Sequence, residues 1–145
     1  MRQLTDAEIV TVLERNGVAV LALSGQTYPY QVPMCYGYVG ESDLLVMQLT
    51  EPAESHKHRH LQASRKASVT VYEETEAGQT WRSVVLRGEL VESAYGEAEQ
   101  AFAALARNTQ SVPNPISWAD STGRTDLTPY EFDVAERTGR EFDIG

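Results

Sequence analysis

The chain has 145 residues, of which 41% are hydrophobic and 23% charged, so it suits one compact domain over residues 1–145 and argues against disorder. Its 21 acidic and 12 basic residues give a formal net charge of -9, which argues against a nucleic-acid partner because most of the surface would repel a duplex. No apolar run approaches the roughly 20 residues that span a membrane, and the polar start has no signal-peptide core, so we expect a cytoplasmic protein.

The first third of the sequence predicts a short helix and then an antiparallel meander. Thr5 and Glu8 have the spacing of a capping box, and apolar residues then recur at helical intervals up to Gly17. Short turns separate the β-like runs that follow, over residues 18–23, 28–39 and 44–49. Successive strands joined by such short turns predict a meander.

The rest of the chain adds three strands and a second helix. Further strands are expected over residues 68–72, 81–92 and 130–134. Within the second of these, Gly88 predicts a bulge or bend. Residues 97–107 predict an amphipathic helix, and the irregular stretch 108–126 has the length of a functional or mobile loop. Six β segments with small helices between them favour a mainly β fold, a closed or nearly closed barrel.

The basic segment, residues 55–66, holds all three histidines and both lysines of the chain. In an acidic protein, such a stretch is the natural place to receive an anion. Only two of the 12 basic residues are lysine. This acidic, lysine-poor balance is halophile-like, since high salt screens the self-repulsion of the surface.

The alternation of His56, His58 and His60 suggests a metal site. On a strand all three would share a face, whereas on a helix only His56 and His60 would. Ser55 is a good N-cap and no β-branched residue is nearby, so the neighbours favour a helix. We therefore expect solvated histidines and no metal centre, although chelation by His56 and His60 stays open.

A helix that begins at Ser55 also provides an anion site. Its first N–H groups, those of residues 56–58, have no partner within the helix, and the helix dipole is positive there. Ser55 adds a hydroxyl and Lys57 a full charge, which together suit a phosphate monoester. The alternative is a capped surface helix whose basic residues pair with glutamates.

Four stretches, taken in order, carry a resemblance to a known family. They are the hairpin 17–38 with Pro29 and Pro33, the segment Lys57 to Leu61 with the strand 67–71, the strand 81–89 with a characteristic glycine near its end, and residues 138–141. Their order and spacing resemble the FMN-binding split barrels related to pyridoxamine 5'-phosphate oxidase, including the nitroimidazole-resistance-like and general-stress-like branches. The resemblance implies a six-stranded antiparallel split β-barrel, with residues 138–141 as a tail after the last strand.

The resemblance also implies a homodimer with two FMN sites at the subunit interface, each built from both chains. The phosphate would be held by Ser55, His56 and Lys57. The isoalloxazine would be lined by Val32, Pro33, Met34, Gln48, Leu49 and Thr50. Trp81 and Ser83 match the strand that approaches the flavin from the partner chain.

Several of these residues also have a simpler interpretation. Val32, Met34 and Leu49 would be apolar on a strand of any barrel, Trp81 suits a core position, and Cys35 suits a small buried hydrophobe.

Residues 30–35 contain no Arg or Lys, and residues 140–145 do not reproduce the substrate-phosphate arginine motif of the oxidases proper. We therefore do not expect vitamin B6 oxidation. Ser55 replaces a glycine common in the nitroimidazole-resistance-like branch, which leaves the branch open.

The expected function is that of an FMN-dependent oxidoreductase, which would pass electrons from a reduced nicotinamide or similar donor to a small acceptor. The flavin ring would carry the redox chemistry, so no general acid or base is assigned. Two alternatives stay open: a binding protein that holds flavin or haem for storage or sensing without turnover, and a protein whose pocket takes a deazaflavin.

Overall fold

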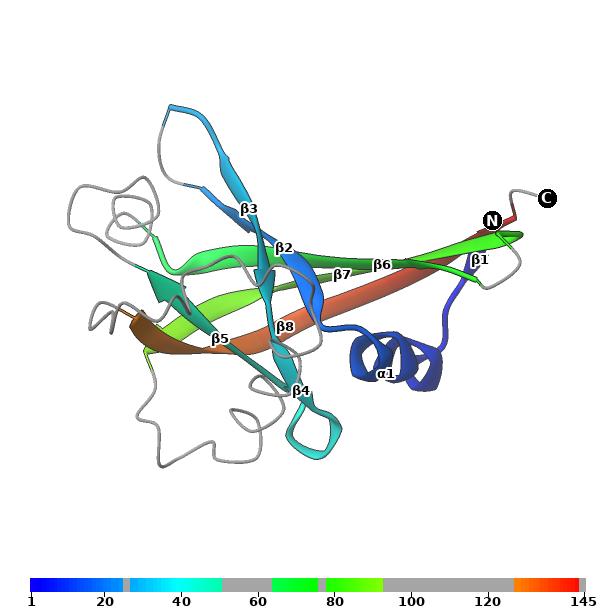
Figure 1. Ribbon diagram of the computed structural model, residues 1–145, viewed down its shortest axis with the longest axis horizontal. Helices are drawn as coiled ribbons and strands as arrows, with labels where there is room; N and C mark the ends of the chain where they lie inside the picture. The colour runs from blue at the N-terminus through cyan, green and yellow to red at the C-terminus, as the bar shows by residue number, and fades with distance from the viewer. Residues whose placement is uncertain (25–26, 51–63, 76–77, 93–126, 144–145) are drawn as a thin grey trace, which may run out of the picture.

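The computed structural model of the chain describes residues 1–24, 27–50, 64–75, 78–92 and 127–143. The elements are β1 (Arg2–Gln3), α1 (Asp6–Arg15), β2 (Val18–Leu23), β3 (Tyr30–Cys35), β4 (Gly37–Val39), the 3-10 turn η1 (Gly40–Ser42), β5 (Leu44–Thr50), β6 (Lys66–Glu74), β7 (Thr80–Glu92) and β8 (Leu127–Asp143) (Figure 1). The fold is mainly β, as expected. In this part of the chain no helix is long and apolar enough to cross a membrane.

All eight strands form one antiparallel sheet, and the order of the strands explains its curvature. From edge to edge the order is β3-β2-β6-β7-β8-β5-β4, and β1 pairs with β8. The two edge strands, β3 and β4, are consecutive in the chain with only Tyr36 between them. The sheet must therefore curl until its edges meet at Tyr36, as the path of the chain shows (Figure 1). This arrangement is the split antiparallel barrel that the sequence predicted.

The described residues form eight strands where six were expected, and each difference has a physical reason. The 28–39 run is interrupted at Tyr36, whose backbone N–H donates to the carbonyl oxygen of Gly17 at 3.0 Å, so β3 pairs with β2 while β4 pairs with β5. The short β1 pairs with the end of β8. Residues 138–141, expected as a tail, lie inside β8, which runs 17 residues because β7 pairs along almost its whole length.

Three expected features fall outside the described residues. They are the helix that begins at Ser55, the helix over 97–107 and the loop over 108–126. The first helix, by contrast, is confirmed. It spans Asp6–Arg15, with both hydrogen bonds of the capping box between Thr5 and Glu8. Glu8 also accepts two hydrogen bonds of 3.0 Å from Arg2, which fixes the approach of β1 to the helix.

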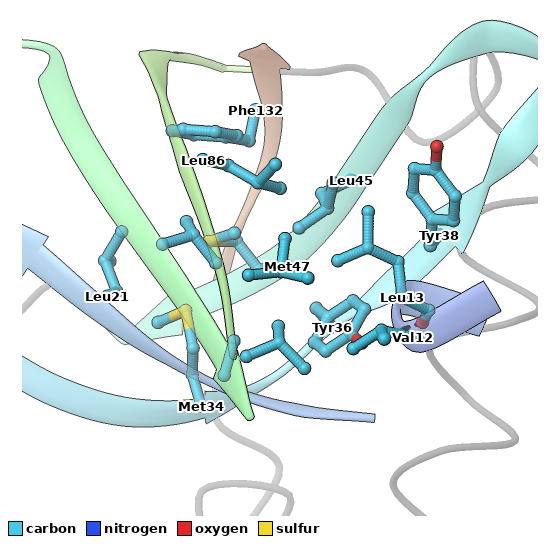
Figure 2. Packing of buried hydrophobic residues seen from close by; sticks show 14 of the residues in the cluster. Val12, Leu13, Leu21, Met34, Tyr36, Tyr38, Leu45, Met47, Leu86 and Phe132 are labelled. Carbon is cyan, nitrogen blue, oxygen red and sulfur yellow. Dashed lines mark hydrogen bonds between the residues drawn. The ribbon is translucent and has the colours of Figure 1, made fainter. Parts of the chain in front are cut away.

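The barrel interior is filled by apolar side chains that alternate along the strands. Figure 2 shows Leu21, Met34 and Met47 with Leu45, Leu86 and Phe132 from the sheet, and Val12, Leu13, Tyr36 and Tyr38 around α1 and the two edge strands. Each fully buried side chain of this size contributes about 1.5–3 kcal/mol to stability. The buried stripe of α1, with Ile9, Val12 and Leu13, is therefore what holds the helix against the barrel.

A bulge near the middle of β7 and β8 confirms the prediction for Gly88. Arg87 pairs with Glu136 and Gly88 pairs with Val134, so Ala135 is an extra residue on β8. A Cβ atom at Gly88 would lie 1.8 Å from the carbonyl oxygen of Asp133. Only glycine fits at this position, because the two backbones approach too closely for any side chain.

Tyr36 joins the helix to both edges of the sheet. Its side chain is fully buried, and its hydroxyl donates to the carbonyl oxygen of Leu13 at 2.7 Å. That carbonyl belongs to the last turn of α1, where carbonyl groups have no partner within the helix. Burial raises the pKa of Tyr36, so the phenol keeps the proton that it donates.

We expect Tyr36→Phe to lower the free energy of unfolding by about 1–3 kcal/mol, because the buried carbonyl of Leu13 loses its donor while the ring remains. Urea denaturation at a fixed protein concentration measures this change. Tyr38→Phe is the matched comparison, since the Tyr38 hydroxyl donates to Asp43 at 3.0 Å in a less enclosed position. If Tyr36→Phe lowers the free energy of unfolding by no more than Tyr38→Phe does, the role of Tyr36 in joining the helix to the sheet edges is contradicted.

The Glu8 carboxylate predicts an acid-dependent loss of stability. The hydrogen bonds from Arg2, and then the one from the Thr5 backbone, lower the pKa of Glu8 from 4.5 to about 2. A lowered folded pKa means that the stabilisation is complete above 4.5 and is lost as the pH falls toward 2. Glu8→Gln can keep the cap but not the charge. The difference in melting temperature between the two proteins should therefore shrink as the pH falls from 4.5 to 2. A constant difference would refute the assignment.

Candidate functional site

The face of the sheet that points away from the core carries a second set of apolar and polar side chains. Directly paired residues of neighbouring antiparallel strands share a face. The register therefore sets Pro33, Val20, Thr70, Val85 and Thr138 in one row across β3, β2, β6, β7 and β8. The next row holds Tyr72, Ser83 and Arg140, and beyond it lie Trp81 and Phe142. We call this surface the outer face.

The predicted ring contacts on β3 divide between the two faces. Pro33 lies exposed on the outer face, whereas Met34 is buried in the core and Val32 packs against the core. The separation follows from the strand alternation, which sends neighbouring side chains to opposite faces. Met34 is therefore an interior residue of the barrel, in agreement with the simpler interpretation of its apolar side chain.

Trp81 and Ser83 lie on β7, on the same outer face as Pro33. Trp81 is only partly buried and stands outside the core cluster, so the core interpretation of this residue was wrong. Its ring stacks on that of Tyr72, with centroids 5.8 Å apart and planes at 23°. Tyr72 is 58% exposed, so the pair forms an aromatic surface that is open to a ligand or a partner.

The remaining predicted contacts are described only in part or not at all. The backbone of Gln48, Leu49 and Thr50 continues β5 and pairs with residues 127–129 of β8. Ser55, His56 and Lys57 lie outside the described residues, between the end of β5 and the start of β6. Their role therefore stays a prediction.

Pockets open along the sheet. One, of about 490 Å³, is lined by small residues that include Ala22, Ala67 and Gly88, and by charged residues. Among these, Arg87 pairs with Glu136 at 3.5 Å, with both side chains about 70% exposed. A second pocket, of about 370 Å³, is lined by β2 and the residues just before it, by Pro33 of β3, and by Thr70 and Tyr72 of β6. Both volumes lie within the usual range for small-molecule sites.

Cys35 and the histidines are the remaining side chains with nucleophilic or metal-ligating chemistry. Cys35 is buried, and burial raises the pKa of its thiol, so it stays protonated as the expected small buried residue. Within residues 1–24, 27–50, 64–75, 78–92 and 127–143, no three His, Cys, Asp or Glu side chains gather as a metal site. The three histidines belong to the segment that the structure does not describe.

Sequence reasoning missed Val18, Tyr72 and Phe142, which are 44%, 58% and 40% exposed on the outer face. Large apolar residues in a strand suggest an interior position. For Val18 and Tyr72 the signal that could have found them is the apolar neighbour Ala19 or Val71, since a strand that is apolar at consecutive positions has two faces to cover.

Known proteins resemble this chain in sequence and in fold. A family model described as pyridoxamine 5'-phosphate oxidase matches residues 5–141. A FAD-binding protein from Mesorhizobium loti has a TM-score of 0.76 and 25% identity, with 97% of each chain covered. A proposed 5-nitroimidazole antibiotic resistance protein from Bacteroides thetaiotaomicron has a TM-score of 0.71 and 16% identity, covering 98% of this chain and 87% of that one.

A third structure, a FAD and heme binding protein from Mycobacterium smegmatis, has a TM-score of 0.68 and 18% identity, covering 100% of this chain and 75% of that one. The likenesses at 16% and 18% identity show a common fold. No curated protein matches the sequence.

Proposed function

Because the chain belongs to the pyridoxamine 5'-phosphate oxidase family, whose model matches residues 5–141, we propose that it binds a flavin at the outer face and works as an oxidoreductase. One observation carries the proposal: the sheet gathers Pro33, Trp81 and Ser83 on a single outward face, although Pro33 is far from the other two in the sequence. The FAD-binding relative from Mesorhizobium loti, alike over 97% of its length, supports a flavin as the class of cofactor.

The described residues of the outer face offer the kinds of side chain that suit a flavin. Pro33 and the Trp81 ring offer rigid apolar surfaces to a planar ring, and Ser83 offers a hydroxyl. A bound flavin supplies the electron transfer, and the protein orients the ring and limits solvent access to it.

Within this proposal, the mononucleotide part of the cofactor, FMN, is held at its phosphate by Ser55, Lys57 and the backbone of His56. The β5 residues Gln48, Leu49 and Thr50 keep their predicted place around the ring, whereas Val32 and Met34 lie on the core side of β3 and would not contact a ring on the outer face. This assignment rests on the resemblance of the sequence and on the anion chemistry of a helix start. NADH or NADPH is the proposed electron donor, and the cytoplasm is the proposed location.

The same face also supports a homodimer. Val18, Tyr72 and Phe142 expose large apolar side chains on this face, and such a surface on a stable protein usually marks an interface. A two-fold contact would bury this surface on both copies at once. It would bring Trp81 and Ser83 of one copy toward the flavin of the other, as the resemblance implies.

Pyridoxamine phosphate oxidation is not part of the proposal. β3 carries no basic side chain, and the stretch that fails to match the arginine motif begins at Arg140, near the end of β8. The relative named as a FAD and heme binding protein supports an alternative in which the barrel holds flavin or haem without turnover. A deazaflavin is the further alternative cofactor.

The purified protein is incubated with FMN and then treated with NADH or NADPH without oxygen. We expect bound flavin, seen as a flavin absorption spectrum that stays with the protein on gel filtration, and bleaching of that spectrum by the nucleotide. Absence of any flavin binding would remove the function. Binding without bleaching by either nucleotide would favour the non-catalytic alternative, and a preference for deazaflavin in competition would reassign the cofactor.

Lys57→Ala should weaken FMN binding by about 1.5–3 kcal/mol, the usual contribution of a charge-assisted contact to phosphate, without loss of the fold. Calorimetric titration measures the affinity, and the far-UV circular dichroism spectrum checks the fold. His60→Ala in the same segment is the matched control and should bind FMN almost as the unchanged protein does. Equal affinities for the Lys57 variant and the unchanged protein would exclude Lys57 from the site.

Phe142→Glu should shift the protein from dimer to monomer, because a buried unpaired carboxylate in the proposed interface is unfavourable. Sedimentation velocity measures the shift. Val91→Glu is the control, since Val91 is similarly exposed, at 44% against 40%, but lies near the opposite end of β7. A dimer that persists in the Phe142 variant, or dissociates equally in both variants, would contradict an interface at this end of the face.

A further inference from the structure

One row of residues divides the outer face into two halves with opposite charges. It holds Thr70, Val85 and Thr138 of β6, β7 and β8, and we call it the middle row. On β8, Arg140 lies two positions from this row in one direction and Glu136 two positions in the other. All three side chains of the middle row are β-branched and uncharged, so they form a surface on which a second sheet can pack.

The strand β6 repeats this arrangement of charges. Its two exposed ends are Glu74 and Lys66, each four positions from Thr70. A two-fold rotation about the middle row reverses the direction of each strand and sets the strand opposite its own copy. It would therefore bring Arg140 opposite Glu136 and Lys66 opposite Glu74.

Arg140 differs from the other arginines that the structure describes. Five of those form ion pairs with carboxylates: Arg2, Arg15, Arg82, Arg87 and Arg137. Arg65 donates to the Tyr130 hydroxyl. The exposed Arg140 instead contacts the sulfur of Met1 at 3.4 Å, and no carboxylate of the described residues pairs with it. In a chain with a net charge of -9, such an arginine remains able to bind an acidic group of a second molecule.

The shape of the face follows the same division. On the Arg140 side of the middle row, Trp81 stacks on Tyr72, and we call these two rings the aromatic pair. On the other side, the pocket of about 490 Å³ is lined by small residues such as Ala67 and Ser68. The aromatic pair and these small residues belong to the same two neighbouring strands, β6 and β7, or to β6 alone. The rotation therefore sets the large side chains of one copy over the pocket of the other.

The predicted flavin contacts favour the same direction of packing. Thr50 of β5 pairs with Leu127 at the start of β8, whereas Trp81 pairs with Phe142 near its end. At about 3.3 Å per residue these pairs lie roughly 50 Å apart along the strand, much further than one flavin ring reaches. A two-fold axis parallel to the strands would leave Trp81 at its own end. An axis across the strands brings it toward the Thr50 end of the partner.

We propose that two copies of the chain dock through the outer face about a two-fold axis that runs across the strands at the middle row. Arg140 then pairs with the partner's Glu136, Lys66 pairs with the partner's Glu74, and the aromatic pair fills the partner's pocket. The proposal rests on the proposed function, because it states which residues of the homodimer meet and how Trp81 reaches the partner's flavin.

Glu136 has room for this second contact. Its contact with Arg87 is 3.5 Å long and both side chains are about 70% exposed, so the pair within one copy contributes little. A carboxylate has two oxygens and accepts from more than one guanidinium. Because the two-fold axis repeats each contact, the interface holds four ion pairs, which offset the repulsion between two acidic copies.

Arg140→Glu and Glu136→Arg should each raise the dissociation constant of the dimer by about 10- to 100-fold, because each sets like charges opposite one another twice. The double variant Arg140→Glu/Glu136→Arg exchanges the charges and should restore the dimer. Within one copy the two residues lie about 13 Å apart along β8, so they cannot restore each other. Sedimentation equilibrium at low salt, where screening is small, measures the dissociation constants, and far-UV circular dichroism checks the fold.

The matched control is Arg140→Glu/Asp133→Arg. Asp133 is an exposed residue of the same face, but it pairs with Glu89, further from the middle row than Glu136. This variant has the same net charge as the exchanged one and should dissociate as readily as Arg140→Glu alone. Restoration by both double variants, or by neither, would overturn the proposed packing. Single variants that leave the dissociation constant unchanged would overturn it as well.

FMN binding by the same proteins separates this proposal from the proposed function. A chain that binds FMN but remains a monomer would overturn the docking and leave flavin binding in place. A dimer that is restored by the exchanged charges, in a protein that binds no flavin, would retain the docking and remove the flavin function.

Discussion

One stretch of chain forms both edges of the sheet, and the rest of the molecule depends on that constraint. β3 and β4 are separated by Tyr36 alone, yet they lie at opposite ends of the strand order. The sheet can satisfy this only by curling, which creates an enclosed interior and a face that the sheet cannot cover itself. Tyr36 fixes the corner through Gly17 and Leu13, so the position of α1 follows from the same residue.

Strand alternation then sorts the side chains. Along β3 it sends Met34 inward and Pro33 outward, and along β7 it sends Val84 inward and Ser83 outward. An apolar side chain on a strand of this chain therefore lies either in the core, on one face, or in a contact surface, on the other. The residues of the proposed site are those that the core does not use.

Local sequence patterns predicted the local structure correctly. They failed where contacts between residues far apart in the chain determine the structure. The capping box of Thr5 and Glu8 and the bulge at Gly88 depend on residue types that have few alternatives, so the sequence was sufficient for both. The break at Tyr36 depends on a hydrogen bond to Gly17, far away along the chain, and no local pattern records it. For the site, the family resemblance indicated Pro33, Trp81 and Ser83. The partners that complete the face, such as Tyr72, are visible only once the register is known.

β8 lies between β7 and β5 in the sheet, and it also pairs with β1. β8 is therefore a central strand of the sheet, although it is the last of the described strands in the chain. One of its partners, β1, lies near the other end of the chain. Contacts of such long sequence separation slow folding. During synthesis, β7 and β5 would each present an unpaired edge until residues 127–143 leave the ribosome. Such edges are prone to aggregation, so a nascent chain interrupted before this strand would be a target for chaperones.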